Sequence, residues 1–257
     1  MNQILKLPNW IELSVIDSCN RACNFCPKSD KDNYPNQPLE MSKQVYTKLF
    51  HELEYYSWKG AIMICGYGEP LLYKDIYNLI SQLSKLDCEI KLVTNGDFLN
   101  EQFIVDLFNY GLTTMYVSLY DDNNQVDYYH NLFKQVGIKN SKYELRERWE
   151  RFGTITNRGG SIENTNCLQQ SCYYPCYFTM IDWNGDVLIC PQDWRKKVKF
   201  GNINNQSLNG IWTSNYYNSF RKNLLLNGRN KAPCKFCDTH GMKKGENEAS
   251  LWGEYYV

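Results

Sequence analysis

Three cysteines near the N-terminus have a spacing that suits an iron–sulfur cluster. Cys19, Cys23 and Cys26 form C-x3-C-x2-C within the stretch D-S-C-N-R-A-C-N-F-C-P-K. Three thiolates this close can each bind one iron of a [4Fe–4S] cube, which leaves the fourth iron open for chemistry. The alternative is a zinc site completed by a distant Cys or His, although zinc ribbons use paired C-x2-C spacings instead.

The last third of the chain contains a second set of cysteines. Cys172 and Cys190 frame a C-x12-G-x4-C pattern, and Cys234 and Cys237 form C-x2-C. Four thiolates would close a second [4Fe–4S] cluster, which then suits electron transfer or rigidity. A structural zinc site fits the same four residues equally well. Cys176 in place of Cys172 gives C-x8-G-x4-C, so the first ligand stays open between these two.

Length and charge exclude several classes of function. The chain has 257 residues with 28 basic and 28 acidic side chains, so it lacks the basic excess typical of nucleic-acid binding. No apolar run approaches the ~18–20 residues of a membrane span, and the N-terminus lacks a signal-peptide core. We therefore expect a cytoplasmic protein with no nucleic-acid or membrane partner. In a reducing compartment, the 11 cysteines are better explained as metal or cluster ligands than as disulfides.

Apolar runs typical of strands alternate with amphipathic helical patterns over the first part of the chain. The predicted strands cover 10–16, 61–65, 89–94 and 113–120, with weaker patterns at 143–149 and 153–156. The predicted helices cover 41–56, 76–86, a stretch from about 101, and 124–136. This alternation indicates parallel βαβ units, and five or six units predict an α/β fold with a partial (β/α)6 TIM-like barrel. The cysteine loop, G-Y-G-E-P and T-N-G each follow a strand, so we expect them to meet at one rim.

From about residue 165 the pattern changes, since helices become sparse and cysteines return. We place the domain boundary there, with the barrel at 1–164 and a small cluster-binding domain at 165–257. Within the second part, W-N-G predicts a hairpin turn between strands at 177–182 and 186–190. Segments 207–212 and 214–226 have helical patterns.

The cysteine triad and two further motifs resemble the radical S-adenosylmethionine (SAM) superfamily. G66-Y67-G68-E69-P70 is similar to the G-G-E-P motif that holds the SAM amino group, and T94-N95-G96 is similar to a segment near SAM. In that family, the open iron is chelated by the amino and carboxylate groups of SAM. The resemblance implies that SAM is bound by Phe25, Tyr67, Gly68, Glu69, Asn95 and Ser118. Taken alone, each of these is also an ordinary turn or strand-end residue.

The late cysteines resemble the twitch annex of SPASM/twitch radical SAM enzymes. Such an annex holds one auxiliary [4Fe–4S] cluster, here implied to be bound by Cys172, Cys190, Cys234 and Cys237. The resemblance extends to N157-R158-G159-G160 and implies that Arg158 and Tyr67 contact the substrate as catalytic residues. A guanidinium can orient a hydroxyl or phosphate, or act as a base if its pKa falls, which is unusual for arginine. The alternative is an arginine that satisfies loop carbonyls.

The resemblance implies a radical SAM dehydrogenase with two [4Fe–4S] clusters. Reductive cleavage of SAM would give a 5′-deoxyadenosyl radical, which takes hydrogen from a small polar substrate such as a sugar, an aminocyclitol or a nucleotide-linked molecule. The auxiliary cluster would accept the remaining electron, which completes the two-electron oxidation of a secondary alcohol. An electron donor such as flavodoxin or ferredoxin is the expected partner. Val93 and Pro191-Gln192 stand where comparable dehydrogenases have Tyr and Phe-Glu near the substrate, so substrate identity is left open.

Three alternatives remain. An epimerase would return a hydrogen atom from a thiol, for which Cys65, Cys167 and Cys176 are candidates. A peptide-modifying enzyme is disfavoured, because the barrel is expected to begin near residue 10 without a leader-binding domain. The non-enzymatic alternative is a zinc-binding interaction module. The basic run from Arg195 to Lys199 suits either substrate phosphates or a solvated surface.

Overall fold

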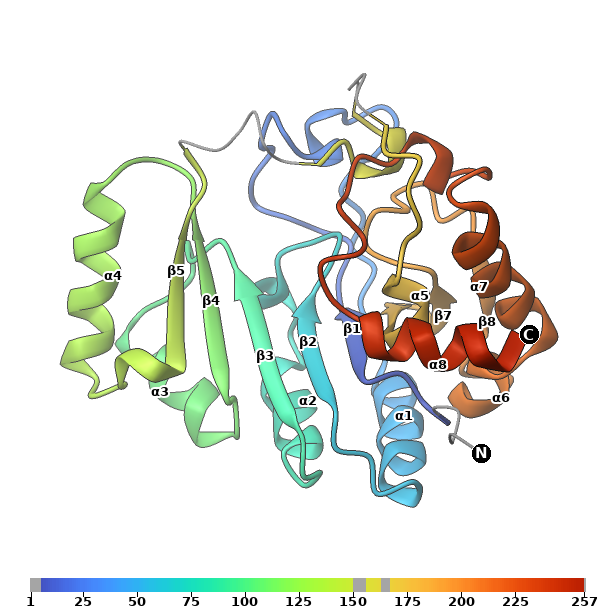
Figure 1. The fold of residues 1–257 in the computed structure, drawn as a ribbon. Helices are drawn as coiled ribbons and strands as arrows, with labels where there is room; N and C mark the ends of the chain where they lie inside the picture. The colour runs from blue at the N-terminus through green and yellow to red at the C-terminus, as the bar shows by residue number, and fades with distance from the viewer. Residues whose placement is uncertain (1–5, 150–155, 163–166, 257) are drawn as a thin grey trace.

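The computed structural model describes residues 6–149, 156–162 and 167–256. Eight strands form one sheet in the order β5-β4-β3-β2-β1-β6-β7-β8 (Figure 1). The strands are β1 (Trp10–Ser14), β2 (Ala61–Cys65), β3 (Glu89–Thr94), β4 (Thr114–Leu119), β5 (Tyr143–Glu147), β6 (Phe178–Asp182), β7 (Asp186–Leu188) and β8 (Lys199–Asn202). The main helices are α1 (Lys43–Tyr55), α2 (Ile76–Leu83), α3 (Glu101–Asn109), α4 (Asn124–Gln135), α5 (Tyr174–Tyr177), α6 (Leu208–Trp212), α7 (Asn215–Asn227) and α8 (Glu246–Tyr256).

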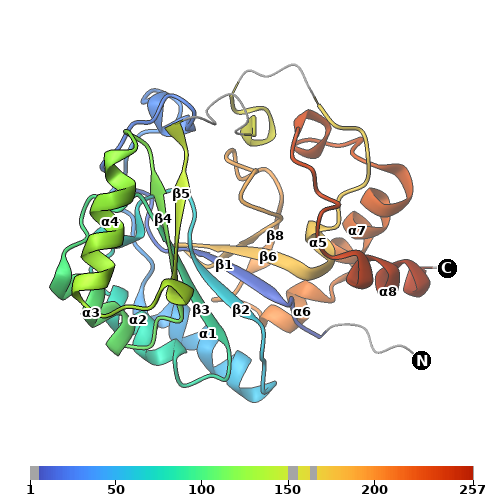
Figure 2. The ribbon, with the colours of Figure 1, turned by 60° about the vertical axis from the view of Figure 1, so that its left-hand side comes forward.

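Strands β1 to β6 pair in parallel, and helices α1 to α4 cover one side of the curved sheet (Figures 1 and 2). The predicted partial barrel is therefore confirmed. The weak pattern at 153–156 falls mostly outside the described residues and stays a prediction. The strand predicted at 177–182 is β6, which also pairs in parallel with the open edge of β1, with Trp10 opposite Phe178. The proposed boundary at residue 164 also lies outside the described residues, and the sheet continues from one proposed domain into the other.

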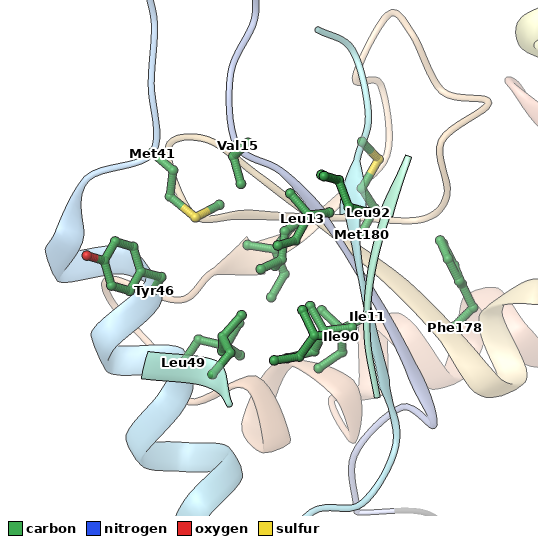
Figure 3. Close-up of a cluster of buried hydrophobic side chains, with 14 of the residues drawn as sticks. Ile11, Leu13, Val15, Met41, Tyr46, Leu49, Ile90, Leu92, Phe178 and Met180 are labelled. Atoms are coloured by element: carbon green, nitrogen blue, oxygen red, sulfur yellow. The ribbon is translucent and has the colours of Figure 1, made fainter. Parts of the chain in front are cut away.

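Alternation along the strands separates an outer apolar face from the barrel interior. Ile11 and Leu13 are completely buried in the hydrophobic core, where Figure 3 draws them with Tyr46 and Leu49 from α1. Because successive side chains point to opposite faces of a strand, the intervening Glu12 lies on the other side of the sheet. The same rule places Ser14 at the end of β1, beside Cys65 of β2.

The C-terminal part contains the predicted hairpin of β6 and β7, which pair antiparallel, and the two predicted helices α6 and α7. Both helices are capped by serine, with the Ser207 and Ser214 hydroxyls accepting from the amides of Gly210 and Tyr217. Three elements were not predicted, namely α5, β8 and α8. Their patterns are weak because α5 and β8 are four residues long and α8 is mostly polar.

Helix α8 is held by one buried aromatic residue. Trp252 packs on the buried guanidinium of Arg221 with 4.0 Å between the guanidinium carbon and the ring centre.

In the described part of the chain, no helix combines the length and apolar character required to span a bilayer.

Candidate functional site

A cavity of about 460 Å³ opens where the parallel strands end. Its wall includes the three predicted ligands of the first cluster, Cys19, Cys23 and Cys26. It also includes the six residues predicted to bind SAM, which are Phe25, Tyr67, Gly68, Glu69, Asn95 and Ser118. Arg158 lines the same cavity. The predicted convergence on one rim is therefore observed, although the role of each residue remains a prediction.

The loop that contains the first cysteines is tied to neighbouring strand ends by an arginine that sequence reasoning missed. Arg21 forms ion pairs with Asp97, which follows β3, at 2.6 Å and with Asp121, which follows β4, at 2.8 Å. Asn20 adds a hydrogen bond to Asp97. These contacts fix the loop over the strand ends and place a positive charge beside Cys23.

The three early thiols are close enough to influence one another electrostatically. The pKa of Cys19 is raised to about 11, mainly by burial, and the neighbouring thiols of Cys26 and Cys23 contribute to this rise. Burial likewise raises the pKa values of Cys23 and Cys26. The nearby cations act in the opposite direction, since Arg21 lowers the pKa of Cys23 and Lys28 lowers that of Cys26. Thiols in this state remain protonated unless a metal displaces the proton, which is typical of a cluster site before metal binds.

Glu69 is a buried carboxylate held by three neutral donors. Its oxygens accept hydrogen bonds from the amide of Leu71 at 3.0 Å, the hydroxyl of Thr94 at 2.7 Å and the amide of Asn95 at 2.8 Å. Among the described residues, no cation pairs with it, and burial raises its pKa despite these bonds. A fixed carboxylate of this kind can accept a hydrogen bond from a ligand ammonium group, which would also restore its ordinary pKa.

The segment before Glu69 approaches the cysteine loop so closely that it requires glycine. A Cβ on Gly68 would lie 2.4 Å from the carbonyl oxygen of Ser18, and the Glu69 amide donates to that same oxygen. On the far side, the rings of Phe25 and Tyr120 lie 5.2 Å apart. These contacts join the cysteine loop to the ends of β2 and β4 as one rigid wall.

The second set of cysteines surrounds a neighbouring cavity. Cys172, Cys190, Cys234 and Cys237 line it together. Burial raises the pKa values of Cys172, Cys190 and Cys234, and the neighbouring thiols of the set act in the same direction. Cys176 does not line this cavity, and its backbone carbonyl accepts a hydrogen bond from Trp252. The structure therefore brings Cys172, rather than Cys176, to the other three thiols.

Arg229 is the buried cation beside these four cysteines. Its guanidinium donates to the carbonyl oxygens of Cys237 at 3.1 Å and Thr239 at 2.6 Å, and it lowers the pKa values of Cys172 and Cys234. Its Nε atom is buried and has no hydrogen-bond partner among the described residues. A buried charge with an unused donor suits an anionic group, so the site fits a cluster held by four thiolates.

Arg158 lies between the two cysteine sets. It begins the short 3-10 helix η5 (Arg158–Gly160), which is anchored because Asn157 donates to Asp238 and to the carbonyl of Phe236. Gly159 has a φ of 61°, and a Cβ there would lie 2.6 Å from the carbonyl oxygen of Gln192. The Arg158 Nε atom is buried without a partner in the described structure, as expected for a group that waits for a ligand.

Tyr67 connects the barrel to the loop after Cys190. Its hydroxyl donates to the carbonyl oxygen of Asp193 at 3.0 Å, and its ring lies 4.8 Å from that of Trp194. The side chain is almost fully buried at 3% exposure, so it closes the cavity wall at this point.

The other candidate residues differ in whether they line the main cavity. Val93, Pro191 and Gln192 line the main cavity, as expected for substrate-facing positions. Cys65 also lines it, whereas Cys167 lines a different pocket. Sequence reasoning missed the cavity residues Glu12, Tyr120, Arg146, Arg148 and Tyr174. Glu12 had a usable signal, since it is the single charged residue within the apolar run W-I-E-L-S-V-I.

Comparisons with known families assign both parts of the chain. Residues 13–153 match the family model described as the radical SAM superfamily. Residues 172–238 match a model described as an iron–sulfur cluster-binding domain, SPASM. The first match covers more than half of the chain.

Individual relatives are consistent with these matches. An S-adenosyl-L-methionine-dependent 2-deoxy-scyllo-inosamine dehydrogenase from Niallia circulans is 28% identical over 248 residues, which cover 94% of this chain and 97% of that protein. The crystal structure of BtrN in complex with AdoMet and 2-DOIA superposes with a TM-score of 0.82 at 28% identity, covering 96% of this chain and 98% of that one. A GTP 3′,8-cyclase from Campylobacter jejuni is 36% identical over 114 residues, but the match covers 43% of this chain and 34% of the cyclase.

Proposed function

We propose, from the premise that this chain belongs to the radical SAM superfamily, that it oxidises a secondary alcohol of a small polar molecule to a ketone. Its family matches indicate SAM and [4Fe–4S] clusters as cofactors. The observation that carries the proposal is the position of the second cysteine set. Its cavity shares Tyr174, Gln192 and Thr239 with the main cavity, so an electron acceptor there would lie next to the substrate.

The proposed first cluster is bound by Cys19, Cys23 and Cys26. When bound, it and SAM supply the radical that removes a hydrogen atom, and the second cluster accepts an electron. Glu69 would hold the SAM ammonium group, because its carboxylate is fixed and has no cationic partner in the described structure. Asn95 and Ser118 would contribute further polar contacts, and Gly68 the close backbone approach. Phe25 and Tyr120 would contact the adenine ring.

The proposed second cluster is bound by Cys172, Cys190, Cys234 and Cys237. The match of residues 172–238 to an iron–sulfur cluster-binding domain favours this cluster over the zinc alternative. Arg229 would offset the negative charge of the four thiolates in a buried site. We propose the same division of domains as the sequence suggested, with the barrel at 1–164 and the cluster-binding domain at 165–257.

The substrate would occupy the space between the two cysteine sets. Arg158 would hold a substrate oxygen, and Tyr67 would shape the wall beside it. We propose an aminocyclitol or a related small polyol as the substrate, because the chain spans nearly all of a relative named for such a molecule. A substrate and SAM that fill this space would exclude water, which protects a radical from side reactions. We infer a reducing cytoplasmic setting and an external electron donor such as flavodoxin or ferredoxin.

Replacing Arg229 with glutamine is expected to lower the reduction potential of the second cluster by about 60 mV or more. That shift corresponds to a tenfold change in a one-electron equilibrium constant, and it follows because a buried cation stabilises the more negative, reduced cluster. Potentiometric titration followed by electron paramagnetic resonance measures the shift. Lys235→Gln is the matched control, since it removes an exposed charge next to Cys234. An equal shift in both variants would contradict a special role for Arg229.

One observation favours epimerisation as a second candidate. Of the three thiols proposed as hydrogen donors, Cys65 lines the main cavity, while Cys167 and Cys176 do not. Burial raises the pKa of Cys65 well above its usual value, so the thiol keeps its hydrogen. A Cys65→Ala variant that still forms the parent product would exclude it as a required donor.

The function is tested by incubating anaerobically reconstituted protein with SAM, a strong reductant and a panel of aminocyclitols and polyols that includes 2-deoxy-scyllo-inosamine. We expect 5′-deoxyadenosine together with a product that is lighter by two hydrogens. A product that has the mass of the substrate in H2O and is heavier by one deuterium in D2O would indicate epimerisation instead. Formation of 5′-deoxyadenosine with no oxidised product from any alcohol in the panel would contradict the dehydrogenase assignment.

A further inference from the structure

Glu12 is a buried carboxylate inside the barrel that the mechanism above does not use. It lies in the middle of β1 with 6% exposure, between the completely buried Ile11 and Leu13 of the opposite face. Its neighbours across the sheet are apolar, with Met63 beside it on β2 and Met180 beside it on β6. In the described structure it has no ion pair. A lone carboxylate in such surroundings is costly to bury and therefore calls for a functional reason.

The environment of Glu12 brings the pKa of its carboxyl group close to neutral pH. Burial raises the pKa of this carboxyl to about 7, while a hydrogen bond from the Cys65 thiol and the charge of Arg158 act in the opposite direction. Both influences come from residues that line the main cavity. The carboxyl group can therefore both lose and regain a proton at ordinary pH.

Glu12 also separates two cavities. On one side is the main cavity, which contains Arg158 and the cysteine triad. On the other is a cavity of about 260 Å³, whose wall includes Trp10 and Phe178 as well as the exposed residues His240 and Lys243. Glu12, Met63, Tyr174 and Pro191 line both. The carboxyl group thus faces the proposed substrate space and a route to solvent.

We propose that Glu12 is a catalytic residue that accepts the hydroxyl proton of the substrate alcohol and releases it through the second cavity. This inference rests on the proposed dehydrogenase function. Oxidation removes a hydrogen atom from the carbinol carbon and a proton from its oxygen, and one electron remains. With SAM and both clusters bound, the hydrogen atom would go to the 5′-deoxyadenosyl radical and the electron to the oxidised second cluster, while the proton breaks from oxygen and bonds to the Glu12 carboxylate. The products would be a ketone, 5′-deoxyadenosine, protonated Glu12 and a second cluster reduced by one electron, so atoms and charge balance.

The two polar groups at the substrate then have different tasks. A guanidinium is protonated and offers donors without an acceptor, so Arg158 suits holding the oxygen and stabilising its developing negative charge. A carboxylate whose pKa lies near the working pH suits receiving the proton. Loss of a hydrogen atom from the carbon makes the neighbouring hydroxyl far more acidic, which favours this transfer.

Several other titratable groups face Glu12, and the buried thiol and phenol groups among them stay neutral at ordinary pH. The facing groups are Cys65 on β2, Tyr67 after β2, Arg158 in η5, Tyr174 in α5, and His240, Lys243 and Lys244 across the second cavity. Burial raises the pKa of Tyr174 to about 12 and raises those of Cys65 and Tyr67 well above their usual values. Of these buried acids, Glu12 is the one that ionises near neutral pH.

The first test requires no substrate. In reconstituted holoenzyme, the infrared carbonyl band of protonated Glu12 should disappear as the pH rises through about 7. The band should be absent from Glu12→Gln and unchanged in Glu101→Gln, whose carboxylate is exposed at the start of α3. Cys65→Ala should move the titration to higher pH, because it removes a hydrogen bond that lowers the Glu12 pKa. A titration near about 4.5, the ordinary glutamate value, would overturn the proposal.

The second test uses whichever alcohol of the panel the parent enzyme oxidises. We expect Glu12→Gln to form 5′-deoxyadenosine within about twofold of the parent rate while ketone formation falls at least about a hundredfold. Glu12→Asp, which retains a carboxylate, should recover part of the loss. For the parent, kcat/KM should rise from about pH 6 to about pH 8, since the base must be ionised, whereas Glu12→Gln should show no such rise.

The outcomes separate the two proposals. A Glu12→Gln variant that forms ketone at the parent rate and with the parent pH profile would overturn the role of Glu12 and leave the dehydrogenase function intact. A parent enzyme that forms no ketone from any alcohol would overturn the function, and with it this role of Glu12. Loss of 5′-deoxyadenosine in Glu12→Gln would also contradict the proposal, because it would place the residue before hydrogen abstraction.

Discussion

Replacing Cys26 with alanine is expected to abolish the cleavage of SAM. The first cysteine set has three thiols, so a cube bound by them already has one iron without a protein ligand. Removing the Cys26 thiol leaves two irons of the cube without a protein ligand, at a site that is partly exposed. We expect iron to fall from about eight to about four atoms per chain, because the second set still holds its cluster. The measurements are iron and sulfide content and the yield of 5′-deoxyadenosine under a strong reductant.

Cys88→Ala is the matched control for this experiment. Cys88 lies immediately before β3 and does not line the cavity, so its removal should leave iron content and SAM cleavage unchanged. A Cys26→Ala protein that kept full iron and still produced 5′-deoxyadenosine at the parent rate would contradict the proposed ligand set. Loss of bound iron and of SAM cleavage in Cys88→Ala would instead indicate a general effect on folding.

Replacing Cys234 with alanine is expected to separate SAM cleavage from oxidation. Cys234 is buried at 8% exposure among the other three late thiols, so its loss opens the proposed second cluster. Without that acceptor, the electron left after hydrogen abstraction has no nearby destination. Ketone formation should therefore fall at least about a hundredfold, which corresponds to about 2.7 kcal/mol of barrier. 5′-Deoxyadenosine formation should continue at a measurable rate, as judged by chromatography of both products from one reaction.

Cys176→Ala decides whether the ligand set is correct. Cys176 is an even more deeply buried thiol that lies outside the second cavity, so this variant should keep both clusters and normal oxidation. Loss of the second cluster in Cys176→Ala, with retention in Cys172→Ala, would show that the structure-based choice between them is wrong. Oxidation by Cys234→Ala at the parent rate would contradict the role of the second cluster as electron acceptor.

The fold was largely predictable because its pattern is local. Strands at 61–65 and 89–94 coincide with β2 and β3, and the helix expected from Glu101 is α3. Apolar periodicity identifies such elements because each must bury one face against the sheet. The strand at 177–182 was predicted as part of a hairpin and coincides with β6, but its parallel pairing with β1 was not predicted. β6 joins the open edge of β1 from more than 150 residues away, and no local pattern encodes that pairing.

The two cysteine sets and the motifs at the strand ends were determined by the sequence alone, because residue type and short spacing decide which chemistry is available. Only the tertiary structure decided which of these residues meet. It brought Cys172 rather than Cys176 to the late thiols, placed Arg229 beside them, and turned Glu12 into the barrel. The physical reason is that ligand spacing is a property of neighbouring residues. Burial, charge compensation and shared cavities depend instead on contacts between segments far apart in the chain.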